Sequence, residues 1–349
     1  MQAENFQSVR RQKFLSESYF KLNVADISRS IEDKREGILS RQARGNLDPV
    51  GQAGIFQDKL DLLKLYYTAG WPIDEIQPQY SDALMAFENW NEDYREYIKS
   101  IAIEDGEDLR TDGTPLRFED LYDFQLALDM VSLGVLLGDG NAIRKFAKCV
   151  ERFRGTDLLF ESLIERAVTD PRDNTDFFHV SPYDPLIDAY YTVETPEEAS
   201  AKIKEYLEGW YKSFEGAPWH NGHLHAVEGE YMPYYGYWAF EAAAICVLYD
   251  IDDTSFRDHL LYPKDLADWA RANHSVDRLS PNAGAGIAGT NESLRCEANQ
   301  PCPKTGYWLT PAQTGSRRYF RQGEVMPAVT SDYGSTIWQW DSDQSDPKL

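Results

Sequence analysis

The sequence predicts an all-α protein, a helical bundle of αα-hairpins in two parts, followed by a small C-terminal extension of loops and strands. Apolar residues recur at spacings of three and four through much of the first 272 residues, as on the buried stripe of a helix. After Arg271 the sequence changes to short segments rich in Pro, Gly and aromatic residues, which is typical of turns and short strands. We therefore expect helical domains over residues 1–115 and 116–272, a flexible linker over 273–290 and a small module over 291–349.

The first predicted helix with a clear boundary covers residues 56–67. Its apolar residues follow at spacings of four, three and four, and the Gly-Trp-Pro sequence at 70–72 then stops it. The same stripe recurs over residues 121–135, at spacings of three, four, three and four. The glycines in residues 138–140 end that helix and a further apolar stripe starts at once, so the two helices form an αα-hairpin.

Two further helical patterns lie in the second half of the chain. Thr195 is a suitable N-cap for a helix over residues 196–214, because a proline takes the first position and two glutamates place negative charge in the first turn. The next pattern runs over residues 234–249, breaks at residues 250–253 and continues as a short helix toward His259. These helices complete the predicted helical body.

The negative charge of the chain is concentrated in its middle. The 349 residues carry a net charge of −23, and residues 49–270 alone hold 43 acids against 18 bases. Such a field repels nucleic acids and anionic membrane surfaces, whose binding requires Lys and Arg. It attracts a basic partner and raises the association rate. The densest acidic cluster lies in one predicted loop, formed by Glu104, Asp105, Glu107, Asp108 and Asp112.

The chain shows no sign of a membrane span or an export signal. The longest uninterrupted apolar run, residues 242–249, is far shorter than the roughly 20 residues that a spanning helix needs. The N-terminus carries no apolar signal region, so we expect a cytoplasmic protein. In a reducing cytoplasm Cys296 and Cys302 are expected to be free thiols, although their closeness in sequence leaves a disulfide open.

His220, His223 and His225 form a histidine cluster, with Glu228 and Glu230 close behind. Imidazoles and carboxylates are standard zinc ligands, so a metal-dependent hydrolase that uses the three histidines is an alternative function. However, the spacing matches no common metal motif, and the cluster lies in a turn where histidines can cap and pack. We therefore predict no metal and no other cofactor.

Glu241 lies inside an apolar helical pattern, so its carboxylate needs a hydrogen-bond partner if the helix is buried. No second acid stands in register with it in the sequence. We therefore expect a structural hydrogen bond to a Tyr or Arg side chain and assign Glu241 no catalytic role.

Four motifs follow one another in the second half: Tyr234-Tyr235-Gly236-Tyr237-Trp238-Ala239-Phe240-Glu241-Ala242-Ala243-Ala244, Asp252-Asp253, Tyr262-Pro263 and Asp265-Leu266. Together they resemble the core of the PoNi family of bacterial immunity proteins. Upstream, Asp188-Ala189-Tyr190-Tyr191 and the Tyr206 to Tyr211 segment resemble the same family, and the resemblance covers roughly residues 8–270. The tail departs from the family pattern and is similar to an accessory module of polymorphic toxin systems.

The resemblance implies a two-part, all-α protein that binds and neutralises a toxin encoded at the same locus. Such a toxin is typically a DNase of the PD-(D/E)xK type that a secretion system delivers, here expected to be a type VI system. The family offers no catalytic residues to carry over, so the resemblance implies that the protein is not an enzyme. The toxin's identity and the protein's own oligomeric state stay open.

Charge and resemblance together lead to one hypothesis for the interface. An acidic surface meets the basic DNA-binding face of the nuclease and blocks DNA entry. Besides the loop of residues 104–112, we expect partner-binding residues among four turn residues: Asp170, Asp173, Asp176 and Asp184. A third possible function is a structural adaptor that engages its partner through the aromatic tail, which deletion of residues 276–349 would test.

Overall fold

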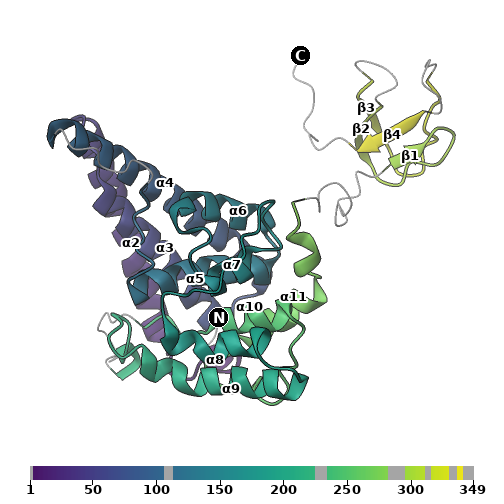
Figure 1. The fold of residues 1–349 in the computed structure, drawn as a ribbon. Coiled ribbons are helices and arrows are strands. Elements are labelled where there is room, and N and C mark those ends of the chain that lie inside the picture. The colour runs from purple at the N-terminus through teal and green to yellow at the C-terminus, as the bar shows by residue number, and fades with distance from the viewer. Residues whose placement is uncertain are drawn as a thin grey trace. The chain divides into compact units, whose positions relative to one another are not determined.

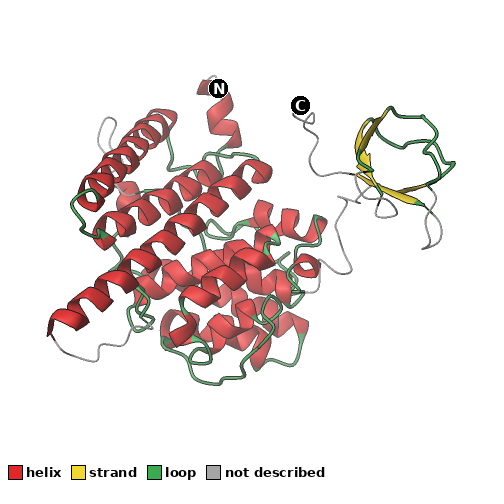
Figure 2. Ribbon diagram, turned by 90° about the horizontal axis from the view of Figure 1, so that it is seen from above, coloured by secondary structure: helices red, strands yellow, loops and turns green. Residues whose placement is uncertain are grey.

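The computed structural model describes residues 3–105, 113–224, 234–281, 295–310, 316–329 and 336–340. Two compact units divide the chain, Met1–Pro281 and Asn282–Leu349. The described part of the first unit contains eleven α-helices, and the strands all belong to the second unit (Figures 1 and 2). This confirms the prediction of an all-α protein with a small β extension. None of the described helices is both long enough and apolar enough to cross a bilayer.

The chain starts with the short helix α1 (Ala3–Val9), followed by three long helices: α2 (Glu17–Gln42), α3 (Pro49–Thr68) and α4 (Ile73–Asp105). Helix α3 packs against both α2 and α4 (Figure 1). It ends, as predicted, just before Gly70, whose φ of +91° suits glycine. A Cβ atom there would lie 2.0 Å from the carbonyl oxygen of Val9, so the turn and the end of α1 approach closely.

The predicted αα-hairpin consists of α5 (Leu121–Leu137) and α6 (Gly140–Cys149), and α7 (Leu158–Ile164) follows. Gly138 adopts the left-handed conformation that ends α5, and the Asp139 side chain caps α6 by accepting from Ala142 N at 2.9 Å. Residues 124–137 of α5 are buried without interruption. Helix α5 is therefore the central helix of the unit, in contact with α6, α7, α10 and α11.

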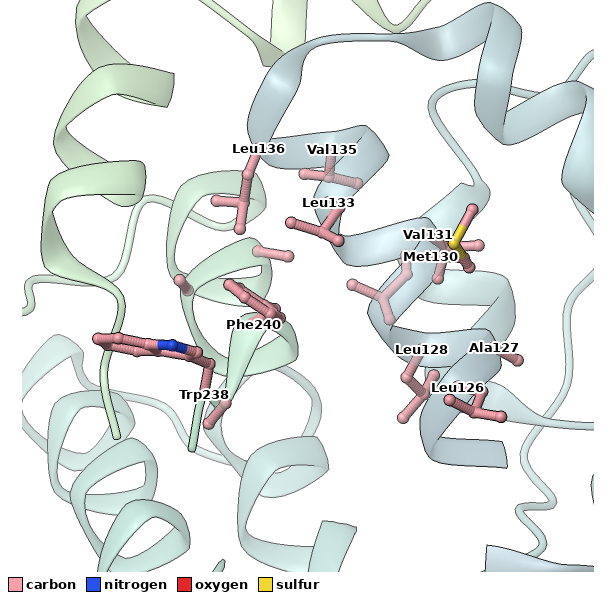
Figure 3. Close-up of a cluster of buried hydrophobic side chains, with 14 of the residues drawn as sticks. Leu126, Ala127, Leu128, Met130, Val131, Leu133, Val135, Leu136, Trp238 and Phe240 are labelled. Atoms are coloured by element: carbon pink, nitrogen blue, oxygen red, sulfur yellow. The ribbon is translucent and has the colours of Figure 1, made fainter. Parts of the chain in front are cut away.

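The second half contains α8 (Val180–Tyr191), α9 (Pro196–Ser213), α10 (Phe240–Leu248) and α11 (Lys264–Ala272), together with the short 3₁₀ helices Glu151–Phe153, Gly222–Leu224 and Val276–Arg278. Thr195 caps α9 as predicted, in a capping box with Glu198. Figure 3 shows Phe240 between Trp238 and the apolar side chains of α5. One continuous hydrophobic cluster extends from Phe6 to Leu279.

The helix predicted over residues 234–249 starts only at Phe240, so the prediction for residues 234–239 is wrong. Gly236 has a φ of +104°, and two buried side chains from the start of the chain bind the backbone of this segment. Gln12 Oε1 accepts from Tyr237 N at 3.0 Å, and Thr68 Oγ1 donates to the Tyr235 carbonyl at 2.6 Å. These long-range bonds replace the helical ones. Likewise, residues 254–261 form turns in place of the short helix predicted toward His259.

Gln12 is 1% exposed and all four of its amide hydrogen bonds reach residues more than 220 positions away. Its Nε2 donates to the carbonyls of Tyr237 at 2.6 Å and Leu260 at 3.0 Å, and its Oε1 also accepts from Tyr234 OH at 2.8 Å. The loop between α1 and α2 is therefore joined through one polar side chain to the segments that precede α10 and α11.

The second unit contains the short antiparallel strands β1 (Arg295–Glu297), β2 (Gly306–Leu309), β3 (Arg318–Phe320) and β4 (Ile337–Trp340), in the order β1-β4-β2-β3. A small core of its own includes Trp308 and Trp338. Cys296 and Cys302 are buried there as free thiols, so no disulfide joins them. In the first unit Ser275 and Leu279, which fall within the expected linker, are fully buried and bonded to the helical body.

Candidate functional site

The acidic loop expected over residues 104–112 lies only partly within the described residues. Glu104 and Asp105 belong to the last turn of α4, which carries no basic residue. The other three, Glu107, Asp108 and Asp112, lie outside the described residues.

Phe118, a few residues after this loop, brings two acidic segments together. Its carbonyl lies 2.8 Å from His179 Nε2, and its ring lies 6.1 Å from the ring of Phe178, measured between centroids. Leu158 N donates to the carbonyl of Asp176 at 2.8 Å, which holds the second segment on the start of α7. Residues 113–123 and 169–184, far apart in sequence, therefore lie side by side.

We call the carboxylates of these two segments the acidic face. It contains Glu119, Asp120, Asp123, Asp170, Asp173, Asp176 and Asp184, accompanied by the two arginines Arg117 and Arg172. The four aspartates that the sequence proposed, Asp170, Asp173, Asp176 and Asp184, all lie in the second of these segments. The three acids around the start of α5 were not proposed from the sequence as partner-binding residues, because acids at this position are typical of a helix N-terminus. In the structure Asp120 caps α5 and accepts from the backbone N–H groups of Tyr122 and Asp123.

The carboxylates of the acidic face differ in whether they have a cationic partner. Asp170 pairs with Arg172 at 3.2 Å and with Arg154 at 3.5 Å, and the hydrogen bond from Arg172 holds the pKa of Asp170 below its ordinary value. Four others are exposed and have no described cation within ion-pair distance: Glu119, Asp173, Asp176 and Asp184. These four are available to a basic partner.

A buried ion pair supports the loop that carries these aspartates. Arg154 and Glu161 are only 3% and 4% exposed, and they form a bidentate pair at 2.8 and 3.2 Å. Arg154 also donates to the backbone carbonyl of Asp170 at 2.9 Å. Asp157 caps α7 and accepts from Phe178 N at 2.9 Å. Bidentate, charge-assisted bonds of this kind fix geometry, so the loop is held at both ends.

The histidines of the alternative metal site lie among aromatic rings. His220 stacks on Tyr211 with ring centroids 4.3 Å apart, and its buried Nε2 has no hydrogen-bond partner. His223 Nδ1 lies 2.8 Å from Tyr237 OH. His225, like Glu228 and Glu230, lies outside the described residues. Among the described residues, no group of three or more His, Cys, Asp or Glu side chains could hold a metal ion.

Glu241 is buried and hydrogen-bonded, as the sequence predicted. Its Oε1 accepts from Tyr206 OH at 2.5 Å and from Trp210 Nε1 at 2.8 Å. Burial, together with the nearby charge of Asp129, raises the pKa of Glu241 to about 7. The arrangement joins α9 to α10 and presents no free oxygen pair to a substrate. Glu241 is therefore a structural residue.

Family models match most of the helical unit. Residues 11–148 match the family described as PoNe immunity protein (PoNi), N-terminal, and residues 155–266 match PoNe immunity proteins (PoNi), C-terminal. Among solved structures, the chain is similar to protein PA2201 from Pseudomonas aeruginosa, with a TM-score of 0.59 and 21% identity. That similarity covers 76% of this chain and 92% of the other, and shows a shared fold. A search of the curated proteins found no match.

Proposed function

The chain belongs to the family of PoNe immunity proteins (PoNi), and we propose on this basis that it binds a cognate DNase toxin and neutralises it. In this proposal the protein acts in the cytoplasm on a toxin delivered by an interbacterial secretion system, and it acts by binding, not by catalysis. The acidic face is the surface that meets the toxin. The single observation that carries this assignment is a group of exposed carboxylates with no cationic partner among the described residues: Glu119, Asp173, Asp176 and Asp184.

The chemistry of a DNase explains why such a surface would inhibit it. A protein that binds DNA positions Lys and Arg side chains against phosphates, so its substrate groove is basic. Unpaired carboxylates on a rigid support are attracted to that groove and exclude DNA from it. The support is rigid because the Arg154–Glu161 pair and the Asp157 cap fix the loop.

Electrostatic attraction sets mainly the association rate, and tight binding requires anchors that become buried. The segment that carries the aspartates of the acidic face also carries apolar side chains suited to this role. Val180 is 60% exposed at the start of α8, and Phe177 beside it is half-buried. We assign the steering to the four unpaired carboxylates and the affinity to this apolar centre.

The test measures binding of the purified full-length protein to the nuclease domain encoded beside it. The variant Asp173→Lys/Asp176→Lys should associate about tenfold more slowly at low salt and show a weaker salt dependence, because the steering field is reversed. DNase inhibition at limiting concentration should fall in parallel. Reversing Glu107 and Asp108 to Lys tests the neighbouring loop in the same way.

The matched control is Glu32→Lys/Asp33→Lys, which makes the same change in net charge on exposed positions of α2. This control should leave both the association rate and DNase inhibition within about twofold of the parent protein. Equal slowing by the control and by the Asp173/Asp176 variant would reduce the effect to net charge and remove the acidic face as the interface. Full DNase activity at saturating wild-type protein would overturn the proposed function itself.

A further inference from the structure

A cavity of about 240 Å³ lies between α3, α5, α9 and the segment over residues 234–239. Aromatic side chains form much of its wall: Tyr122, Trp210, Trp219, Tyr235 and Trp238. Polar groups of α3 complete it, and Asp61 is the most buried of them. The cavity belongs to neither the acidic face nor the histidine cluster.

The tryptophans of this cavity have their indole N–H groups bound to the surrounding protein. Trp219 Nε1 donates to Gln125 Oε1 at 3.1 Å, and Trp238 Nε1 donates to Thr68 Oγ1 at 2.9 Å. Trp210 Nε1 donates to Glu241, and the Trp210 and Trp219 rings stack with centroids 5.2 Å apart. Because these donors are already used, what the rings contribute to the cavity wall is aromatic surface, and aromatic rings attract cations.

Asp61 is a buried carboxylate in the cavity wall that forms no ion pair with any described residue. It is 7% exposed, and its Oδ1 accepts from Gln57 Nε2 at 2.9 Å. Lys64, one turn further along α3, instead pairs with the buried Asp129 of α5 at 2.5 Å. No described cation lies within ion-pair distance of Asp61. A buried carboxylate is stabilised as an ion only by a cation or by several hydrogen bonds, and Asp61 has a single bond.

We propose that this cavity binds an organic cation, an alkylammonium or alkylguanidinium group, with Asp61 as its counter-ion and the aromatic rings around its alkyl part. A cation would complete the charge balance of Asp61 and fill a space whose wall is formed in large part by five aromatic side chains. The volume equals that of roughly eight water molecules, which suits a guest of a few heavy atoms. The strongly acidic chain raises the local concentration of such cations.

Binding depends on pH in a defined direction. Burial raises the pKa of Asp61 to about 7, opposed by Lys64 and the Gln57 hydrogen bond and reinforced by the charges of Asp58 and Asp129. Tyr122, which faces Asp61 from α5, has its own pKa raised by burial and stays neutral in this range. Since the guest pairs with the ionised form of Asp61, affinity rises as the pH passes through about 7.

The test titrates the full-length protein with n-butylammonium and n-butylguanidinium, with n-butanol as the uncharged match. Tryptophan fluorescence and calorimetry near pH 8 should show saturable binding of both cations and none of the alcohol. The variant Asp61→Asn should bind the cations about tenfold more weakly, and so should the parent protein near pH 6. Asp82→Asn, which removes an ion-paired carboxylate on α4 outside the cavity, should bind like the parent.

The proposal is overturned if n-butanol binds as well as n-butylammonium, if no titration saturates, or if Asp61→Asn binds the cations unchanged. A second variant, Trp219→Leu, protects the test against a folding defect in the first. It should weaken both cations while keeping the rise in affinity with pH, and a pH dependence that disappears with the ring would contradict the role of Asp61.

The cation has two possible sources, a Lys or Arg side chain of a bound toxin or a free small amine. If the nuclease domain displaces n-butylammonium, a toxin side chain occupies the cavity, and if both bind together, the ligand is a free amine. The inference goes beyond the proposed immunity function and does not depend on it. A protein that fails to bind the toxin but binds the cations refutes only the former.

Discussion

The exposed carboxylates of the acidic face and the buried carboxylates of Asp61 and Glu241 are the same chemical group in opposite surroundings. Asp173 and Asp176 lie in solvent with no described cation beside them. Asp61 and Glu241 lie among aromatic rings, where burial raises the pKa of each to about 7. The first pair is suited to act at a distance through its field, and the second pair can act only through direct contact.

The difference shows that an acidic composition has to be divided by burial before it is interpreted. Exposed acids keep their charge and contribute little to stability, whereas a buried acid must find hydrogen bonds or a counter-ion. The two sets should therefore respond differently to substitution, pH and salt.

The largest effect on stability is expected from breaking the buried ion pair between Arg154 and Glu161. Arg154→Met leaves the charge of Glu161 buried and unpaired, so the free energy of unfolding should fall by about 3–5 kcal/mol in urea titrations. The double variant Arg154→Met/Glu161→Leu should recover much of this loss, because no buried charge remains. A loss of less than about 1 kcal/mol in the single variant would show that the pair does not support the loop.

The buried set should make stability fall as the pH rises. Because the folded-state pKa of Glu241 is about 7 against an ordinary 4.5, the folded protein holds more protons between these values, and stability decreases as the pH rises through that interval. Glu241→Gln should reduce this decrease by about 2 kcal/mol between urea titrations near pH 5 and near pH 8. The exposed Asp176→Asn should not change the decrease, and an identical pH profile for Glu241→Gln would contradict the assignment.

Within the acidic face, neutralising a carboxylate that has no ion-pair partner should slow toxin association more than neutralising one that is already ion-paired. Asp173→Asn removes an unpaired charge and should slow association about twofold to threefold at low salt. Asp170→Asn removes a charge already compensated by Arg154 and Arg172, so its effect should be smaller. Stopped-flow or surface-binding kinetics decide this, and a larger effect at Asp170 would mean that partner binding rearranges its ion pairs.

The smallest effect is expected from removing the second unit. A chain ending at Pro281 keeps the whole helical unit, so its free energy of unfolding should change by less than about 0.5 kcal/mol. A chain ending at Ala272 also loses the buried Ser275 and Leu279 and should be less stable by about 2 kcal/mol. If the chain that ends at Pro281 no longer binds the toxin, the result would favour the adaptor function of the tail.

Helices whose signals are local could be predicted from the sequence. The stripe of α5 and the capping box of α9 each lie within one stretch of chain, so their ends were found to within a few residues. The start of α10 was missed because Gln12 and Thr68, distant in sequence, take the backbone bonds of residues 234–239. The need of a buried Glu241 for a partner followed from its apolar neighbours alone.

The site was predictable only in part. The sequence nominated Asp170, Asp173, Asp176 and Asp184 from charge, but their position beside Glu119 depends on the packing of Phe118 against Phe178, which leaves no local pattern. The cation cavity was missed entirely. Its walls come from several separate elements, and in the sequence its aromatic residues look like ordinary core.

The buried amide of Gln12 also determines when the newly made protein can finish folding. Its partner Tyr237 is 225 residues further along the chain, so the loop that carries Gln12 cannot complete its hydrogen bonds until most of the protein has been synthesised. At about 5–20 residues per second, that interval is roughly 10–45 s. Contacts of such long range also slow folding itself. The helical unit therefore completes its core contacts only after residues 234–261 have been synthesised.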